Sequence, residues 1–303
     1  TSARDGTVTL TAATTPSLRT ASSSTTTVRG KLTGSGNLIK YGAGNLYLTN
    51  ANNDFSGAVT LREGTIMINT ANGFGTASLQ IGNGTTNTTF QVSNNVTSAA
   101  GLSISNSSTA GVVEVGSGFT YTQSGNLTQA GGTDNATKFG KAGAGTLLLS
   151  GTGSSYGGQL QIGNGTVIVA QNNALSTNTT TSARGIDLGL NVGDTNLANN
   201  VAVLGRNGVT ISNSIYVAQN TNDATRTIGL DGTGTTTFNN EIYLDGTLTA
   251  TAASGGNAII SGNIVTNISG AGGGLTKAGA GTVTLAGANT YNGATAVGAG
   301  TLL

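Results

Sequence analysis

Short runs of alternating apolar and polar positions recur along the chain and predict β-strands. In residues 46–48, 66–68 and 147–149, the first and third positions are aliphatic. Alternation of this kind, bounded by Gly or Asn, is typical of a strand with one buried face. Helical periodicity is missing from every window of a dozen residues, and Thr, Asn and Gly are poor helix formers. The pattern therefore predicts an all-β fold.

One arrangement of strands and turns occurs three times, at about residues 34–69, 138–170 and 272–303. Each copy has a lysine, a Gly-Ala-Gly turn, an aromatic residue two places before a glycine, and a Gly-Thr pair. The repeated positions are Lys40, Gly42, Gly44, Phe55, Gly57 and Gly64, then Lys141, Gly143, Gly145, Tyr156, Gly158 and Gly165, then Lys277, Gly279, Gly281, Tyr291, Gly293 and Gly300. We interpret these residues as structural positions of a repeat.

The spacing inside each copy indicates a solenoid. Matching strands recur after roughly 20 residues, which is about one coil of a β-solenoid. The connecting runs are also compatible with hairpins. We predict a parallel β-helix of about a dozen rungs, right-handed as parallel crossovers usually are. The segments at about 70–130 and 170–270 alternate less regularly and are expected to form further rungs, so that residues 1–303 make one continuous solenoid.

The composition suits such a thin structure. The chain has 303 residues, of which 36% are hydrophobic and only 4% aromatic. A single compact core would need more large apolar side chains, whereas each layer of a solenoid buries only a narrow core against its neighbours. The 50 glycines and the abundant Thr and Asn favour many tight turns between short strands.

The same composition excludes several classes of function. With no His and no Cys, the chain lacks the usual ligands of zinc, haem and iron–sulfur sites and any catalyst based on those side chains. Its 12 cations and 11 acids are scattered, so a nucleic-acid interface is not expected. No apolar run approaches about 18 residues, so no membrane insertion is expected. We expect no cofactor, although Asp and Asn oxygens could bind Ca²⁺ weakly.

The three copies resemble the autotransporter-associated β-strand repeat, also called the passenger-associated transport repeat. The third copy carries the shared pattern most fully, with Lys277, Asn289, Tyr291 and a closing Gly-Thr-Leu. The first copy has Phe55 in place of the tyrosine, and the second has Ser154 in place of the asparagine. The resemblance implies β-helical passengers of large bacterial surface or secreted proteins, which are often adhesins or stalks.

The repeat pattern runs up to Leu303. We therefore expect the chain to be a window of a longer protein or a processed subunit. Open solenoid ends expose strand edges, so we also expect them to stack on identical chains or on further repeats.

The repeated lysines and aromatics each allow two interpretations. The lysines could form a ladder of cations that binds an anionic glycan, or they could be solvated turn residues that discourage edge pairing, which we favour. The aromatics could form a carbohydrate-stacking surface. The favoured interpretation is that each packs over the bare backbone of a neighbouring glycine.

Acidic residues deserve a separate test, because parallel β-helices include polysaccharide lyases and hydrolases. A glycosidase needs two carboxyl groups about 5 to 9.5 Å apart. The densest groups of candidates are Asp223, Asp231, Asp245, Glu241 and Arg226, and then Asp187, Asp194 and Arg184. Most of these acids stand beside Gly, Asn or Thr, as turn residues do, which favours a protein without catalytic residues.

The sequence therefore predicts a non-enzymatic extracellular protein that forms a stalk, fibre or matrix element of a bacterial cell surface. Its expected partner is itself, through end-to-end stacking or neighbouring repeats. The alternative is an adhesin or autotransporter passenger that binds a host or matrix glycan or protein, with surface glycans or proteins as partners, and a polysaccharide lyase or hydrolase is the third hypothesis.

Overall fold

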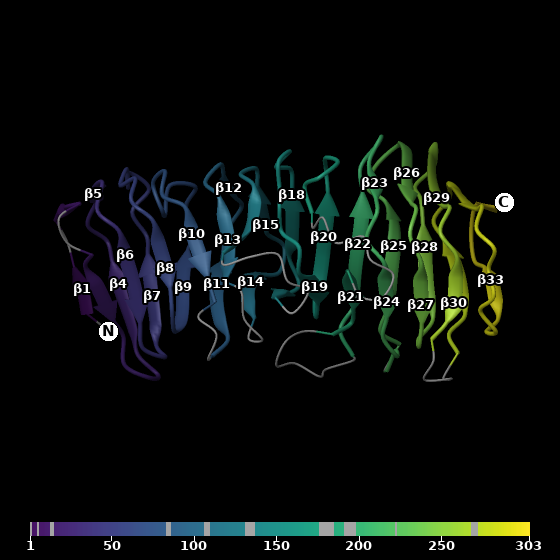
Figure 1. Ribbon diagram of the computed structural model, residues 1–303, viewed down its shortest axis with the longest axis horizontal. Coiled ribbons are helices and arrows are strands. Elements are labelled where there is room, and N and C mark those ends of the chain that lie inside the picture. The colour runs from purple at the N-terminus through teal and green to yellow at the C-terminus, as the bar shows by residue number, and fades with distance from the viewer. Residues whose placement is uncertain are drawn as a thin grey trace.

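The protein is a long rod of stacked β-strand turns (Figure 1). The computed structural model describes residues 2–4, 6–12, 15–82, 86–105, 110–130, 137–175, 185–190, 198–221, 223–267 and 272–303. Chain order follows the long axis, so the two termini lie at opposite ends (Figure 1). All the described elements are strands.

The strands pair in parallel and build a β-solenoid of about 11 turns, as the sequence predicted. Within the repeats, Leu46 pairs with Ile66 and Leu147 with Val167, the residues separated by 20 positions in the sequence. This parallel register rules out the hairpin alternative for these strands. The right-handed sense stays a prediction.

Each full turn passes through three faces. The first face is one 12-stranded sheet. Its strands are β1 (Ser2–Arg4), β4 (Thr25–Val28), β7 (Asn45–Leu48), β9 (Gly64–Ile68), β11 (Thr88–Val92), β14 (Gly111–Val115), β17 (Lys138–Ala142), β19 (Gln159–Ile162), β21 (Ile186–Leu188), β24 (Ile215–Val217), β27 (Ile242–Leu244) and β30 (Ile264–Thr266).

The second face follows the first in every full turn. It begins with a two-stranded sheet and continues as a nine-stranded sheet. Its strands are β2 (Val8–Leu10) and β5 (Leu32–Gly34), then β12 (Val96–Ser98), β15 (Thr120–Gln123), β18 (Thr146–Leu149), β20 (Gly165–Val169), β22 (Val201–Gly205), β25 (Arg226–Leu230), β28 (Leu248–Thr251), β31 (Leu275–Ala278) and β33 (Thr295–Val297).

The third face closes the turn. It consists of a six-stranded and a five-stranded sheet, one after the other along the rod. Its strands are β3 (Ser17–Arg19), β6 (Leu38–Tyr41), β8 (Val59–Leu61), β10 (Leu79–Ile81), β13 (Leu102–Ser105) and β16 (Leu127–Ala130), then β23 (Thr210–Ile211), β26 (Gly234–Phe238), β29 (Gly256–Ile260), β32 (Thr282–Leu285) and β34 (Thr301–Leu302).

The repeats are the places where a turn has two strands instead of three. The first repeat consists of β6–β7 followed by β8–β9, and its turns have no strand on the second face. The second repeat has β17–β18 and β19–β20 without a third-face strand, and the third has β31–β32 and β33–β34 without a first-face strand. In each repeat the segment that carries the repeated aromatic replaces the missing strand.

The core is a set of side-chain columns that run along the rod. Inward positions on consecutive strands stack, so that the leucine, isoleucine and valine residues of neighbouring turns form one continuous cluster. Aromatic rings also join this column: Phe90 lies 5.2 Å from Phe74 and 5.3 Å from Tyr121 between ring centroids. Side chains from adjacent turns therefore exclude water together, although each turn alone buries little.

Asparagines link turns at the corners, where strand pairing stops. The side-chain oxygens of Asn37, Asn95 and Asn207 each accept a 2.8–2.9 Å hydrogen bond from a backbone N–H one turn further on. The amides of Asn50 and Asn72 donate to carbonyls one turn back. Bonds between outward Thr and Asn side chains of neighbouring turns are limited to a few contacts. Asparagine instead replaces ladder bonds that the corner backbone has lost.

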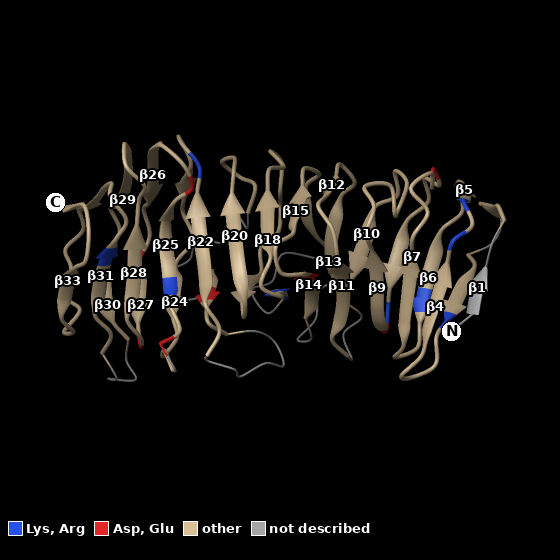
Figure 2. Ribbon diagram, turned by 180° about the vertical axis from the view of Figure 1, so that it is seen from behind, with Lys and Arg blue, Asp and Glu red and all other residues tan. Residues whose placement is uncertain are grey.

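Charged side chains are sparse over the whole rod (Figure 2). Two ion pairs are present among the described residues, Lys31 with Asp54 and Arg206 with Asp231, and all four side chains are substantially exposed. Exposed pairs of this kind contribute little to stability. The fold therefore depends on burial and backbone pairing.

Replacing Phe90 with Ala removes a fully buried ring that touches two other rings. We expect a loss of about 3–5 kcal/mol in the free energy of unfolding, because the rigid stack cannot close the cavity. Denaturant unfolding measures this loss. Thr89→Ala, which changes an outward-facing side chain on the same strand, is the control and should change stability by less than about 0.5 kcal/mol; equal effects would contradict the stacked core.

Candidate functional site: the lysine corners

The three repeated lysines are buried inside the solenoid. Lys40, Lys141 and Lys277 have no exposed surface. Both sequence interpretations are therefore wrong: the lysines are neither an external cation ladder nor solvated turn residues. Strand alternation explains their position, because each lysine lies two residues after a buried apolar side chain on the same side of its strand.

Each ammonium group is held by three backbone carbonyls in the same arrangement. Lys40 Nζ donates to the carbonyls of Tyr41, Gly42 and Glu63 at 3.0, 2.6 and 2.9 Å. Lys141 and Lys277 bond the corresponding carbonyls at distances between 2.7 and 3.0 Å. The first two acceptors lie in the corner that directly follows the lysine in the sequence. The third lies in the equivalent corner of the next coil of the solenoid. The lysine therefore connects two successive corners from inside.

The two corners that the lysine joins are built on glycines with positive φ. Gly143 and Gly165 have φ of 72° and 76°, and the other repeats match. The corners also stack closely, because a Cβ on Gly165 would lie 2.5 Å from the carbonyl oxygens of both Gly143 and Gly145. Only glycine combines this backbone conformation with this approach. The resulting geometry turns carbonyls inward, toward the lysine.

The three lysines occupy three different corners of the rod. Lys40 precedes the corner between the third and first faces, Lys141 that between the first and second, and Lys277 that between the second and third. Each successive repeat is thus advanced by one face. As a result, each of the three corners between the faces is joined by a buried lysine at one place along the rod.

Burial makes the charged form of these lysines less favourable. It lowers the pKa of Lys141 to about 7, with Glu114 partly opposing the shift. It lowers the pKa of Lys40 to about 8, with Glu63 opposing, and also lowers the pKa of Lys277. An ammonium group has three donors, which match the three carbonyls in each cradle.

A small polar residue two places before the aromatic also bridges turns. The Asn53 side chain accepts from the N–H of Leu32 at 2.8 Å and donates to the carbonyl of Gly73 at 3.0 Å. Ser154 makes the equivalent pair of contacts, and Asn289 accepts from the N–H of Ile264. Sequence reasoning assigned no role to Asn53 or Ser154; their common distance from the aromatic was the available signal.

The aromatics of the first two repeats lie in the core, where they fill the space of the missing strand. Phe55 and Tyr156 are fully buried, so neither can stack on a carbohydrate. Tyr156 covers Gly158, whose added Cβ would lie 2.5 Å from the tyrosine hydroxyl. Tyr291 is only partly buried, and its hydroxyl lies 2.6 Å from Thr295 Oγ1.

The acidic residues of the first cluster have separate partners. Asp231 pairs with Arg206, Asp245 accepts from the hydroxyl of Tyr216, and Glu241 accepts from the hydroxyl of Tyr243. Arg226 is buried and donates to the carbonyls of Asn199 and Gln219. Asp223 is an exposed turn residue with φ of 58°.

In the second cluster, Asp187 is buried and accepts from Gln161 at 3.3 Å. Asp194 and Arg184 lie outside the described residues. Across the part of the chain that the structure describes, no group of three acidic residues could hold a metal ion. No described helix could span a membrane.

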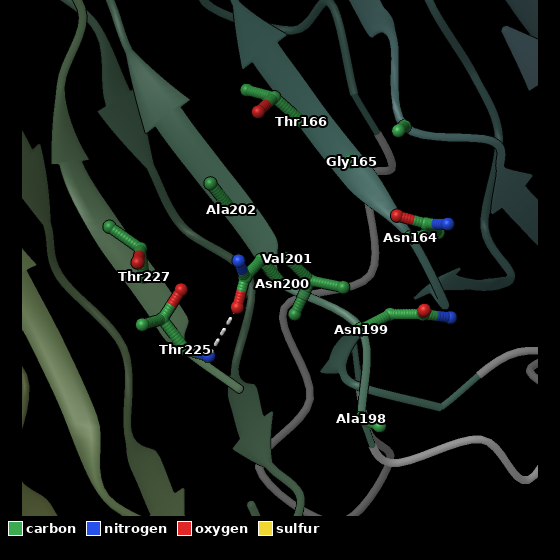
Figure 3. Close-up of a pocket in the computed structure, with 11 residues that line it drawn as sticks. Asn164, Gly165, Thr166, Ala198, Asn199, Asn200, Val201, Ala202, Thr225 and Thr227 are labelled. Atoms are coloured by element: carbon green, nitrogen blue, oxygen red, sulfur yellow. Dashed lines mark hydrogen bonds between the residues drawn. The ribbon is translucent and has the colours of Figure 1, made fainter. Parts of the chain in front are cut away.

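A hollow of about 630 Å³ lies beside the corner of the second repeat. Figure 3 shows its lining of Asn, Thr, Ala and Val side chains, with the backbone of Gly165, from the first residues of β20, β22 and β25 and the segments just before them. Asn200 bonds the N–H of Thr225 across it. The described residues of the lining carry no charged side chain, so they lack the groups needed for acid–base chemistry.

Replacing Lys141 with Met removes the ammonium group and keeps most of the side-chain volume. At pH 9, where a pKa of about 7 leaves Lys141 uncharged, we expect the free energy of unfolding to fall by about 1–3 kcal/mol, because the corner carbonyls lose their side-chain donor. Lys138→Met is the matched control, since it deletes a partly exposed lysine from the same strand. An equal, small effect for both variants in denaturant unfolding would contradict the role of the cradle.

Stability should also rise with pH. Between about pH 7 and pH 10, the unfolded lysine keeps a proton that the buried Lys141 has lost. The unfolded state then binds more protons, so the free energy of unfolding increases with pH, by up to about 1.4 kcal/mol per pH unit for Lys141. Unfolding measured from pH 6 to pH 10 tests this. A profile with the same slope in Lys141→Met would contradict it.

The comparisons with known proteins agree with the position of the lysine corners. The family model of the passenger-associated-transport-repeat matches residues 38–68, 139–169 and 275–303. These ranges contain the three lysines and the paired corners, and they cover about three tenths of the chain. Searches of curated proteins and of solved structures find no match. The chain therefore contains three passenger-associated-transport-repeats, each of which includes one buried lysine corner.

Proposed function

We propose that this chain is a non-enzymatic structural rod, a stalk or fibre element of a bacterial surface or secreted protein. The observation that carries the proposal is the first face, a single parallel sheet that continues through 12 strands from β1 to β30. A sheet of this kind supplies length and stiffness.

The backbone hydrogen bonds run along the rod axis. Tension on the two ends of the rod therefore acts at once on all the hydrogen bonds that join two neighbouring turns. These bonds lie on three faces in a full turn and on two faces in a repeat. Each bond contributes about 0.5–1.5 kcal/mol net, and the asparagine bridges and lysine cradles add contacts in the same direction. The arrangement suits a protein that must keep its length under load.

The repeats support an exported location. The matched family model describes a passenger-associated repeat, and a β-solenoid is a suitable form for a passenger-like segment. We therefore place the chain outside the cell or on its surface. Asp231 pairs with Arg206, Asp245 with the hydroxyl of Tyr216 and Glu241 with the hydroxyl of Tyr243. These contacts favour structural roles for the acids over the two cooperating carboxyl groups of a glycan-cleaving enzyme.

An adhesin is the second candidate, favoured by one observation. Tyr243 is partly exposed on β27 of the first face, in register with the buried Tyr216 on β24. Their hydroxyls bond Asp245 and Glu241. Aromatic rings beside carboxylates can bind sugars by stacking and hydrogen bonding.

Electron microscopy and a panel of polysaccharides distinguish these functions. We expect the purified chain to form straight rods, to cleave no polysaccharide and to bind no glycan on an array. Cleavage that disappears in an Asp231→Asn, Asp245→Asn double variant would overturn the structural proposal in favour of an enzyme. Glycan binding that disappears in Tyr243→Ala would favour the adhesin.

A further inference from the structure

The outward side of the nine-stranded sheet on the second face has no charged side chain. The charged residues in its strands are Arg226 and Lys277, and both point into the core. The first face differs, because Glu114 and Lys138 are partly exposed on it. Surfaces normally use scattered charges to prevent association, so this long neutral face needs an explanation.

Two rows of outward residues run along this face. One row is nearly all threonine: Thr120, Thr146, Thr166, Ala202, Thr227, Thr249 and Thr276 occupy equivalent positions on seven consecutive strands. In the second row, Leu148, Ile168 and Leu204 lie side by side on β18, β20 and β22. Ile168 and Leu204 are partly exposed. The face thus has an aliphatic strip at its centre beside a strip of hydroxyl and methyl groups.

We propose that a second copy of this chain packs face to face on this sheet, so that rods associate side by side. A second copy has the same rise of about 4.8 Å per turn, and its rows can match these rows over their whole length. Two neutral faces also meet without repulsion between like charges. Threonine hydroxyls can bond across the contact, and the aliphatic strips exclude water, as in packed sheets of other assemblies.

The size of the contact indicates a weak association. Nine strands extend over roughly 40 Å, and two rows with their side chains are roughly 12 Å wide. Each copy would bury on the order of 500 Å², about 1,000 Å² in total, which is at the lower limit for a specific interface. Such contacts become effective when many rods are held close together, because the local concentration is high. The inference thus rests on the proposed structural function and adds a lateral partner to it.

Cysteine cross-linking tests the proposal, because the natural chain has no Cys. Leu204 lies on β22, the central strand of the face, outside the hollow, and lies opposite its equivalent when the two rods are antiparallel, the orientation that sets like rows against each other. Thr89 on β11 of the first face is the matched control. Because packed sheets lie about 10 Å apart, a short bis-maleimide reagent is used, and Leu204→Cys should form cross-linked dimers at least about tenfold faster than Thr89→Cys. Equal rates, or no dimer from either variant at high concentration, would overturn the proposal.

A charge variant gives an independent readout. Leu204→Lys places a cation in the aliphatic strip, and sedimentation velocity should show that it abolishes the concentration-dependent association of the Cys-free chain. Gln91→Lys adds the same charge to the first face and should associate as the natural chain does. If the natural chain stays monomeric, or if a neutral polysaccharide occupies the face, the proposal that a second copy packs on this face is wrong. Straight rods in the microscope would then still support the structural function.

Discussion

The structure depends on how backbone carbonyls are satisfied where the chain changes direction. Along the faces, parallel ladders pair every turn with the next. At the repeat corners the positive-φ glycines turn carbonyls toward the interior, where water does not reach them and no strand can pair with them. Lys40, Lys141 and Lys277 supply the missing donors from inside. One lysine side chain thus donates hydrogen bonds to the carbonyls of two stacked corners.

The lysine contacts between stacked corners also determine the shape of the repeat. With two corners fastened together, a turn can omit one strand and fill the gap with an aromatic and a small polar bridge, as Tyr156 and Ser154 do. Because the three repeats use three different corners, the omitted strand falls on a different face each time. The described turns therefore keep strands on at least two faces. The strands that the three repeats omit fall on a different face in each repeat.

Much of the fold could be predicted because strand alternation and repeat spacing are local properties. The pairing of Leu46 with Ile66 follows from their spacing. Burial of the lysines was missed because lysine is usually exposed, and composition alone gives no reason to place it inside. Strand alternation does indicate it: Leu38 and Lys40 are two positions apart on one strand, so their side chains point to the same side, and a buried Leu38 implies an inward Lys40. The carbonyl cradle itself depends on which corners stack, and that becomes known only from the assembled turns.

Native-state hydrogen exchange in Lys141→Met tests the central claim most directly. In the natural chain, the amides of Gly145 and Thr166 bond the carbonyls of Val115 and Gly145 across successive corners. If the lysine fastens these corners, the variant loses protection at these amides, while amides around the Lys277 corner keep theirs. Unchanged protection at Gly145 and Thr166, or a uniform loss along the whole rod, would contradict the account.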